Sequence, residues 1–385
     1  MKTLEIFFAL LRAELCGEPL SDDVKNSITE EKLSVMFKTA KAHDIANILA
    51  SALEKNGILT DNDISDKFRQ EQLLSIYRYQ RIKHEIENIS RTFEEEKIPY
   101  IPLKGSVIRA FYPEPWMRTS CDIDILVREE DIEKAAALLS DRLKYETDGK
   151  REFHDVSLHS PSGVHLELHF NILENLENID KLLLHAWDHA SAVSDGVMKH
   201  SFSNEFLLFH VLAHMSYHFI FGGCGIRPFI DLYLLEKNME YDKEKLLRIC
   251  RECGIEKFYE SVKKLSEVWF DGLAHDELTE EIQHFILVGG AYGDHKKGIA
   301  ARQAKIGGKK AYAIKRIFQP YNVLKEKYPI IKKYPIFTPI FEVKRWFDLL
   351  LRGKMKSSIR ELKANSVVTE EQSRSAVEFL LKLGL

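Results

Sequence analysis

The chain has 385 residues, a formal net charge of -4 and a hydrophobic fraction of 45%. This composition is that of a globular protein and excludes the disordered, collagen-like and disulfide-scaffold classes. Charge is distributed unevenly, because residues 296–365 contain 19 Lys and Arg but only four Asp and Glu. We therefore expect an acidic body followed by a basic C-terminal segment.

The cysteines and the apolar runs bear on the compartment. Five sparse cysteines, an odd number, favour a reducing environment, so we expect a cytoplasmic protein. Glu5, Arg12 and Glu14 interrupt the apolar N-terminal stretch, which does not favour a signal peptide. Residues 206–226 contain no Asp, Glu, Lys or Arg, but three histidines and a glycine-rich end favour a buried helix over a membrane span. We expect no membrane partner.

The first half of the chain changes its pattern near residue 98. Residues 1–97 carry apolar side chains at helical spacing and predict an N-terminal helical region that ends in a long charged helix. A mixed sheet with one intervening helix, over 129–142, is predicted for 98–175. Its expected strands are short apolar runs with strand propensity, at 98–103, 122–127, 151–160 and 164–170.

The second half is predicted to be helical again. Residues 176–295 are assigned to a helical domain, with helices expected over 179–192, 204–221, 228–237 and 243–269. Residues 296–385 are assigned to a basic C-terminal region packed on the body. The predicted fold class is therefore α+β: a small mixed sheet flanked by N-terminal and C-terminal helical regions.

Three carboxylates are the strongest chemical signal. Side chains alternate faces along a strand, so Asp122 and Asp124 point the same way in the segment DIDILV. In VHLELHF the same alternation puts Glu167 on the polar face, and it would join the two aspartates if the strands are neighbours. Clustered carboxylates repel unless a cation lies between them, and hard divalent cations prefer oxygen ligands. Three carboxylates fit a two-metal site, whereas a solvated polar strand face is the alternative.

A second group of residues could meet phosphate. Lys104, Gly105 and Ser106 follow the first predicted strand, where a small residue lets backbone N–H groups approach phosphate oxygens. Arg118 lies four residues before Asp122 and could donate a fork of hydrogen bonds to a phosphate; a surface arginine is the alternative.

These residues carry a resemblance to a known family. The stretch IPYIPLKGSVIRAFYPEPWMRTSCDIDILV, followed by VHLELHF, resembles an uncharacterised nucleotidyltransferase family within the DNA-polymerase-beta-like superfamily. The superfamily pattern is an apolar residue, Gly, then Gly or Ser, a spacer, Asp-x-Asp and a later carboxylate. The spacer between Ser106 and Asp122 is slightly longer than usual, and the Pro113-Glu114-Pro115 insertion accommodates the excess. Further similar segments, such as KAHDIANILASAL and HVLAHMSYHF, extend the resemblance over nearly the whole chain.

The resemblance implies a reaction and its cofactor. It implies a nucleotidyltransferase sheet that moves a nucleoside monophosphate from an NTP to an acceptor and releases pyrophosphate. Asp122 and Asp124 would hold two Mg²⁺ ions, with Mn²⁺ as the other candidate, and Glu167 would complete one site. ATP is the expected donor because of its abundance. The acceptor stays open among small hydroxylated metabolites, saccharides, antibiotics and protein side chains.

The resemblance also implies roles for neighbouring residues. Gly105 and Ser106 would cradle the triphosphate, with Lys104 and Arg118 neutralising charge. His169 also fits the family's strand and is a candidate for substrate contact.

Histidines define a rival hypothesis. His210, His214 and His218 recur every four residues on one helical face, and with His43-Asp44 they suggest a metal-dependent phosphohydrolase. The alternative is structural or substrate-contacting histidines, with His214 as the candidate contact. Arg227 and Asp231 are expected to pair with each other or with this face.

Two other sequence patterns each allow more than one interpretation. The Cys250-x-x-Cys253 spacing is interpreted as chance near a helix end rather than as a redox or zinc site. The basic segment, rich in aromatic residues, could bind nucleic acid, or its cations could lie over the protein's own acidic surface. A non-catalytic nucleotide- or RNA-binding protein is therefore the third hypothesis.

Overall fold

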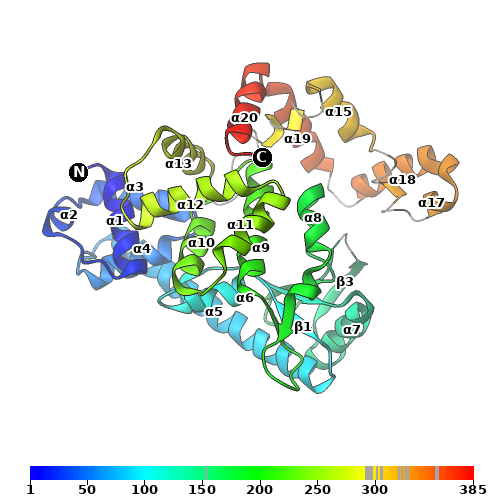
Figure 1. The fold of residues 1–385 in the computed structure, drawn as a ribbon, viewed down its shortest axis with the longest axis horizontal. Coiled ribbons are helices and arrows are strands. Elements are labelled where there is room, and N and C mark those ends of the chain that lie inside the picture. Colours follow the sequence, from blue (N-terminus) through cyan, green and yellow to red (C-terminus); the bar gives the residue numbers. More distant parts are fainter. Residues whose placement is uncertain are drawn as a thin grey trace. The chain divides into compact units, whose positions relative to one another are not determined.

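The computed structural model describes residues 1–151, 154–290, 298–300, 302–303, 307–319, 321, 324–325, 328, 330–351 and 355–385. Two compact units are formed (Figure 1). The first comprises Met1–Tyr217, Cys224–Tyr292 and Gly384, and the second comprises His218–Gly223, Gly293–Leu383 and Leu385. The expected boundary between residues 295 and 296 lies outside the described residues.

The first unit begins with helices, as the periodicity predicts. Thr29 and Asn62 cap two of them, because each side chain accepts a hydrogen bond from the backbone N–H three residues later. The helices are α1 (Thr3–Cys16), α2 (Asp22–Asn26), α3 (Glu30–Ala42), α4 (Ala46–Lys55) and α5 (Asp63–Glu95).

A five-stranded mixed sheet follows, with strand order β1-β2-β5-β4-β3. The pairing of β2 with β5 is parallel, and the other three pairings are antiparallel. The predicted α+β class with a small mixed sheet is therefore confirmed. The strands are β1 (Tyr100–Pro102), β2 (Asp122–Val127), β3 (Glu146–Arg151), β4 (Asp155–His159) and β5 (His165–His169).

One face of this sheet is covered by two helices. Ile123 and Ile125 of β2 are buried together with Ile89 of α5 and Leu139 of α7 (Ile132–Leu143) in one hydrophobic core. The opposite face carries the polar residues of β2 and β5. Because side chains alternate along a strand, the same packing that buries the isoleucines directs Asp122 and Asp124 away from this core.

Two sequence expectations about the segments from 151 to 192 need correction. The single strand expected over 151–160 is wrong, since β3 ends at Arg151 and β4 begins at Asp155. The polar sequence ETDGKR of β3 lacks the alternation by which a strand is recognised. The helix expected over 179–192 is α8 (Glu177–Leu183), and its last residues instead form β6 (Ala190–Ala192), which pairs with β7 (His200–Phe202).

The remaining helices of the first unit largely follow prediction. A third expectation, one helix over 243–269, also needs correction. The chain forms two helices there, separated at Gly254, whose φ of +74° favours glycine. The helices are α9 (Asn204–Ile220), α10 (Arg227–Asn238), α11 (Lys243–Glu252), α12 (Glu256–Phe270) and α13 (Glu277–Gly289). Within the described ranges no helix has both the length and the apolar character needed to cross a membrane.

The second unit has a small core of its own. Ile299, Ala300, Tyr312 and Val368 form a buried cluster, and Tyr312 donates a hydrogen bond to Glu361. The described helices are α15 (Lys309–Ile317), α17 (Ile330–Lys333), α18 (Thr338–Leu351), α19 (Met355–Val367) and α20 (Glu370–Lys382), and a short 3-10 turn, η5 (Pro335–Phe337), precedes α18.

The core beneath the sheet yields a stability prediction. Ile125 is 1% exposed, so Ile125→Ala should lower the free energy of unfolding by about 2–5 kcal/mol, because it leaves a cavity between β2 and the helices. Denaturant titration followed by circular dichroism measures this loss. Val35→Ala, at an exposed position of α3, is the control and should change stability by less than about 0.5 kcal/mol. Equal stability of the two variants would contradict the assigned core.

Candidate active site

The parallel pairing of β2 with β5 brings the predicted carboxylates together. Asp124 is the register partner of Glu167, and Asp122 is the register partner of His165. The condition set by the sequence, that the two strands be neighbours, is therefore met. Asp122, Asp124 and Glu167 are each partly exposed.

His169 lies between two of these carboxylates. Its Nε2 is 3.2 Å from Oδ1 of Asp124 and 3.4 Å from Oε2 of Glu167. Burial by itself would lower the pKa of His169, but its hydrogen bonds to both carboxylates outweigh burial and raise the pKa to about 9. A protonated imidazole therefore balances the charge of Asp124 and Glu167. Its other nitrogen, Nδ1, is buried and has no hydrogen-bond partner in the described part of the chain.

The carboxylates differ in their tendency to ionise. Burial, followed by repulsion from Asp124 and Glu167, raises the pKa of Asp122. The hydrogen bond with His169 lowers the pKa of Glu167. Burial would raise the pKa of Asp124, yet the same histidine and the charge of Lys104 hold it below its usual value. Asp122 is thus the carboxylate that gains most from an added cation.

The donor set fits a divalent cation. Ligand atoms of Asp124, Glu167 and His169 lie within 4.8 Å of one another, and Asp122 adds a further carboxylate on the same strand face. Carboxylate oxygens suit Mg²⁺ and Mn²⁺, whereas an imidazole ligand favours transition metals. A second triplet, His154, Asp155 and His169, shares the same histidine. The carboxylate oxygens of Asp122, Asp124 and Glu167 are therefore the ligands that would hold the expected Mg²⁺ or Mn²⁺.

The turn after β1 holds Lys104 in an unusual conformation. Lys104 has φ of +33° and ψ of -104°, a sparsely populated region for a residue with a side chain. The short helix α6 (Gly105–Ile108) follows at once, and the backbone N–H of Ser106 donates to the carbonyl of Leu103 at 3.0 Å. The N–H of Leu103 in turn donates to the carbonyl of Asp124, also at 3.0 Å, which ties this turn to β2.

Arg118 lies under this turn and is clamped there. Its Nε and Nη2 donate to the two carboxylate oxygens of Asp231 on α10 at 3.1 and 2.8 Å. A Cβ on Gly105 would come within 2.6 Å of Nη1 of Arg118, so only glycine fits without moving the clamp. Burial opposes its charge, but Asp231 raises the pKa of Arg118. Arg118 thus contacts the Gly105 backbone region and Asp231, in a buried position.

A pocket of about 210 Å³ opens beside the carboxylates. Lys104, Asp124, Glu167 and His169 line it together with Glu174 and the histidines of α9, His210 and His214. Five of the nine residues predicted for the site, His214 among them, therefore line this pocket. Gly105, Ser106, Arg118 and Asp122 are not among its lining residues.

Part of the lining of this pocket is a cluster of charged and polar groups, formed by Lys104, Glu174 and His214. Nδ1 of His214 is 2.8 Å from Oε1 of Glu174 and 3.0 Å from Nζ of Lys104. Burial and then Lys104 lower the pKa of His214, which favours the neutral form of the ring. Burial would raise the pKa of Glu174, but the hydrogen bond with His214 and the charge of Lys104 lower it to about 2. A single ring nitrogen thus contacts both an ammonium and a carboxylate.

The geometry does not favour the phosphohydrolase hypothesis. Among the described residues, the groups able to hold a metal include neither His210 nor His214. Burial lowers the pKa of His43 to about 4. The expected pairing of Arg227 with Asp231 is wrong, because Arg227 Nη1 lies 2.7 Å from Oδ2 of Asp44. Asp231 is used by Arg118 instead.

Other candidate motifs have structural roles in the described residues. Cys250 and Cys253 are at the end of α11, and burial raises their pKa values to about 12 and 11.

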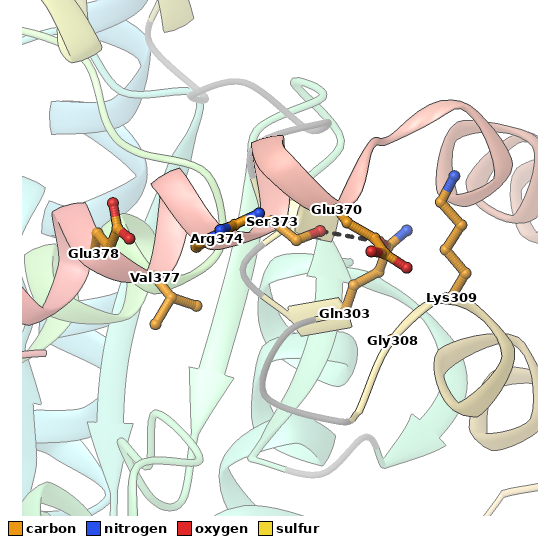
Figure 2. Close-up of a pocket in the computed structure, with 8 residues that line it drawn as sticks. All are labelled: Gln303, Gly308, Lys309, Glu370, Ser373, Arg374, Val377 and Glu378. Carbon is orange, nitrogen blue, oxygen red and sulfur yellow. Dashed lines mark hydrogen bonds between the residues drawn. The ribbon is translucent and has the colours of Figure 1, made fainter.

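A second pocket, of about 350 Å³, lies in the C-terminal unit beside Gly308 and Lys309 (Figure 2). Its buried Gln303 accepts a hydrogen bond from Ser373 and donates to Asn365, so that its side chain is already satisfied.

Sequence reasoning missed several residues that shape the site. Glu174 lies in an irregular segment after β5, where no periodicity marks it. Buried Arg109 donates to the carbonyl of Gly105 at 2.7 Å and to the hydroxyl of Ser120 at 2.9 Å, yet it reads as a surface residue of a short helix. The role of Asp231 depends on a contact with Arg118 across more than 100 residues of sequence. Only a signal from paired substitutions could have found it.

Comparison with known proteins places the chain in a family. No curated protein and no solved structure is significantly similar to it. The family model described as uncharacterised nucleotidyltransferase matches residues 29–271, which is more than half of the chain and contains the sheet, the turn at Lys104 and α9. The chain therefore belongs to this uncharacterised nucleotidyltransferase family.

Proposed function

We propose that the chain transfers a nucleoside monophosphate from an NTP, with ATP as the expected donor, to an acceptor hydroxyl or phosphate. An acceptor oxygen would form a bond to the α-phosphorus while the bond to the bridging oxygen breaks and pyrophosphate leaves. The observation that supports this most directly is the pairing of Asp124 with Glu167 across β2 and β5, beside a pocket that Lys104 also lines.

We further propose that Asp122, Asp124 and Glu167 hold divalent cations, Mg²⁺ or Mn²⁺. Bound cations would supply positive charge to the phosphate oxygens and to the attacking and leaving oxygens. The support from this chain is electrostatic: three carboxylates share one strand face, and the pKa of Asp122 is raised by burial and by its two neighbours. His169, which contacts two of these carboxylates, would then orient them or contact substrate.

Lys104 is proposed to bind a phosphate group of the nucleotide. Its ammonium is 3.0 Å from Nδ1 of His214 and 3.9 Å from Glu174. Nδ1 of His214 can donate a hydrogen bond to Glu174 only when it is not accepting one from the Lys104 ammonium. An anionic ligand that attracts Lys104 would therefore leave His214 to donate to Glu174, which would hold the ring in one tautomer toward an acceptor.

The turn residues are proposed to position the phosphates. The backbone N–H of Ser106 already donates to the carbonyl of Leu103. Ser106 would therefore contact a phosphate through its side-chain hydroxyl. Arg118 would act through the shape of the Gly105 turn, because Asp231 engages two of its three nitrogens. The cytoplasmic location and the small-molecule, saccharide or protein acceptor remain part of the proposal.

Replacing both β2 aspartates tests the carboxylate site. Asp122→Asn/Asp124→Asn should weaken binding of Mg·ATP and lower pyrophosphate release by at least roughly 100-fold, because the oxygen ligands lose their charge. Calorimetric titration of Mg²⁺ with each NTP measures the binding. Glu129→Gln/Glu130→Gln removes the same charge from exposed positions in the 3-10 turn η3 (Glu129–Asp131), beyond the end of β2, and should behave as wild type. Undiminished Mg·ATP binding by the aspartate variant would contradict the assignment.

Metal removal separates catalysis from simple nucleotide binding. Pyrophosphate release should stop in EDTA and return when excess Mg²⁺ or Mn²⁺ is added, because phosphate charge would otherwise be unbalanced beside the carboxylates. A pyrophosphate assay over a panel of acceptors measures it. A non-catalytic binding protein would instead bind ATP equally with and without Mg²⁺ and release no pyrophosphate with any acceptor.

Lys104 offers a separate test of the phosphate contact. Lys104→Met should raise the dissociation constant for ATP by roughly tenfold or more, because a charge-assisted hydrogen bond is lost. Fluorescence titration with a labelled ATP analogue measures the change. Lys134→Met on α7, which removes an exposed lysine, is the matched control. If both variants bound ATP alike, Lys104 would not be a phosphate ligand.

A further inference from the structure

Helix α18 in the C-terminal unit has its polar and apolar faces reversed. Glu342 and Arg345 are 8% and 5% exposed and form an ion pair of 2.8 Å. Ile340, Val343 and Phe347, on the other face, are 62%, 57% and 60% exposed. A helix in water normally buries its apolar stripe, so this arrangement indicates a surface that is covered in use.

The buried ion pair fixes this orientation. The Glu342 carboxylate accepts a hydrogen bond from the backbone N–H of Gln319, and Arg345 donates to the carbonyl of Ile317 at the end of α15. Rolling the helix to bury Ile340 would leave these charged groups without partners, at a cost that exceeds the gain from one aliphatic side chain. The apolar face is therefore held outward by specific contacts.

The exposed stripe continues beyond the helix. Ile336, 83% exposed in η5, extends the helical spacing of Ile340, Val343 and Phe347, and these four residues are named here the α18 apolar face. Around it in the sequence lie further exposed apolar and aromatic side chains: Ile314, Phe318, Tyr321, Ile330, Tyr334, Phe337 and Trp346. Two ring pairs, Tyr334 with Phe337 and Phe318 with Trp346, have centroids 6.1 Å apart.

Cations accompany this surface. Lys332, Lys333 and Lys344 are exposed, and residues 296–365 hold 19 basic residues against four acidic ones. The ammonium of Lys333 lies 5.5 Å from the ring centroid of Tyr334, and that of Lys344 lies 5.7 Å from the ring centroid of Tyr328. Aliphatic anchors with aromatic and lysine neighbours are the composition of a helix that lies in a membrane interface.

We propose that the α18 apolar face docks the C-terminal unit peripherally on an anionic lipid bilayer, with α18 lying in the headgroup plane. An RNA would use the lysines and the aromatic rings but would gain nothing from Ile336, Ile340 and Val343, because nucleic acid binds through phosphate contacts and base stacking. An anionic bilayer uses the apolar and the basic residues together. The 14 residues of α18 span roughly 21 Å, too short for a crossing, which needs about 30 Å of apolar length.

Vesicle flotation of the full chain tests this docking. The chain should bind vesicles of phosphatidylcholine with one quarter phosphatidylglycerol, and bind pure phosphatidylcholine at least about tenfold less tightly. Ile340→Glu/Phe347→Glu should reduce binding to the anionic vesicles by at least tenfold, because two exposed apolar side chains that would enter the bilayer become charged. Lys332→Glu/Lys333→Glu should reduce it by roughly fivefold per lysine, and raised salt should have the same direction of effect.

A matched control separates the apolar contact from net charge. Leu73→Glu/Tyr77→Glu changes two exposed residues of α5, 67% and 59% exposed, and adds the same charge. It should bind anionic vesicles like wild type. Equal losses in the two glutamate pairs would overturn the proposal, since charge alone would then explain binding. Circular dichroism melting should be unchanged in both, because all four side chains are exposed.

Two further outcomes would also overturn it. One is failure to bind any vesicle combined with tight, salt-sensitive binding of oligouridylate that Lys332→Glu/Lys333→Glu weakens. The other is a dimer seen by light scattering that Ile340→Glu/Phe347→Glu dissociates, because a second copy of the chain would then cover the α18 apolar face. Neither result would alter the nucleotide tests, which concern residues of the first unit.

Discussion

The parallel pairing of β2 with β5 is the constraint on which the candidate site depends. These strands are separated in the sequence by α7, β3 and β4, yet their register sets Asp124 opposite Glu167. Because side chains alternate, a slip of one residue would turn Glu167 toward the core and expose Leu166 or Leu168 to the pocket. The apolar residues of both strands oppose such a slip. The core thus determines the position of the polar groups.

Charge balance is the second feature of the site. Asp124 and Glu167 are balanced by His169 from their own sheet, while Lys104 is shared between Glu174 and His214. His169 and Lys104 are therefore each already close to a carboxylate of the protein. Binding of a triphosphate with divalent cations would exchange these internal pairs for external ones, which makes the site responsive to both components at once.

Periodicity predicted what repeats along the chain. The alternation in DIDILV and VHLELHF predicted which face of each strand carries its carboxylates, because a buried strand must place every second residue in the core, but the parallel pairing that joins the two faces came only from the structure. The strand β3 was not predicted, since its sequence ETDGKR has no apolar face. Glu174 and Arg109 were missed because each depends on a contact made in three dimensions. The histidines of α9 suggested metal ligands by spacing, but in the fold His214 contacts Lys104 and Glu174, and the buried Nδ1 of His210 has no hydrogen-bond partner among the described residues.

The buried pair of Arg118 and Asp231 has a consequence for the minimum size of a working fragment. A protein shortened to the sheet region alone, residues 98–175, would retain every carboxylate of the site but would lack α10. Arg118 would then be an uncompensated cation beneath the Gly105 turn, and the turn would lose the group that fixes its shape. The turn at Gly105 is therefore completed by a helix from outside the sheet, so a fragment that keeps this turn in shape must include α10.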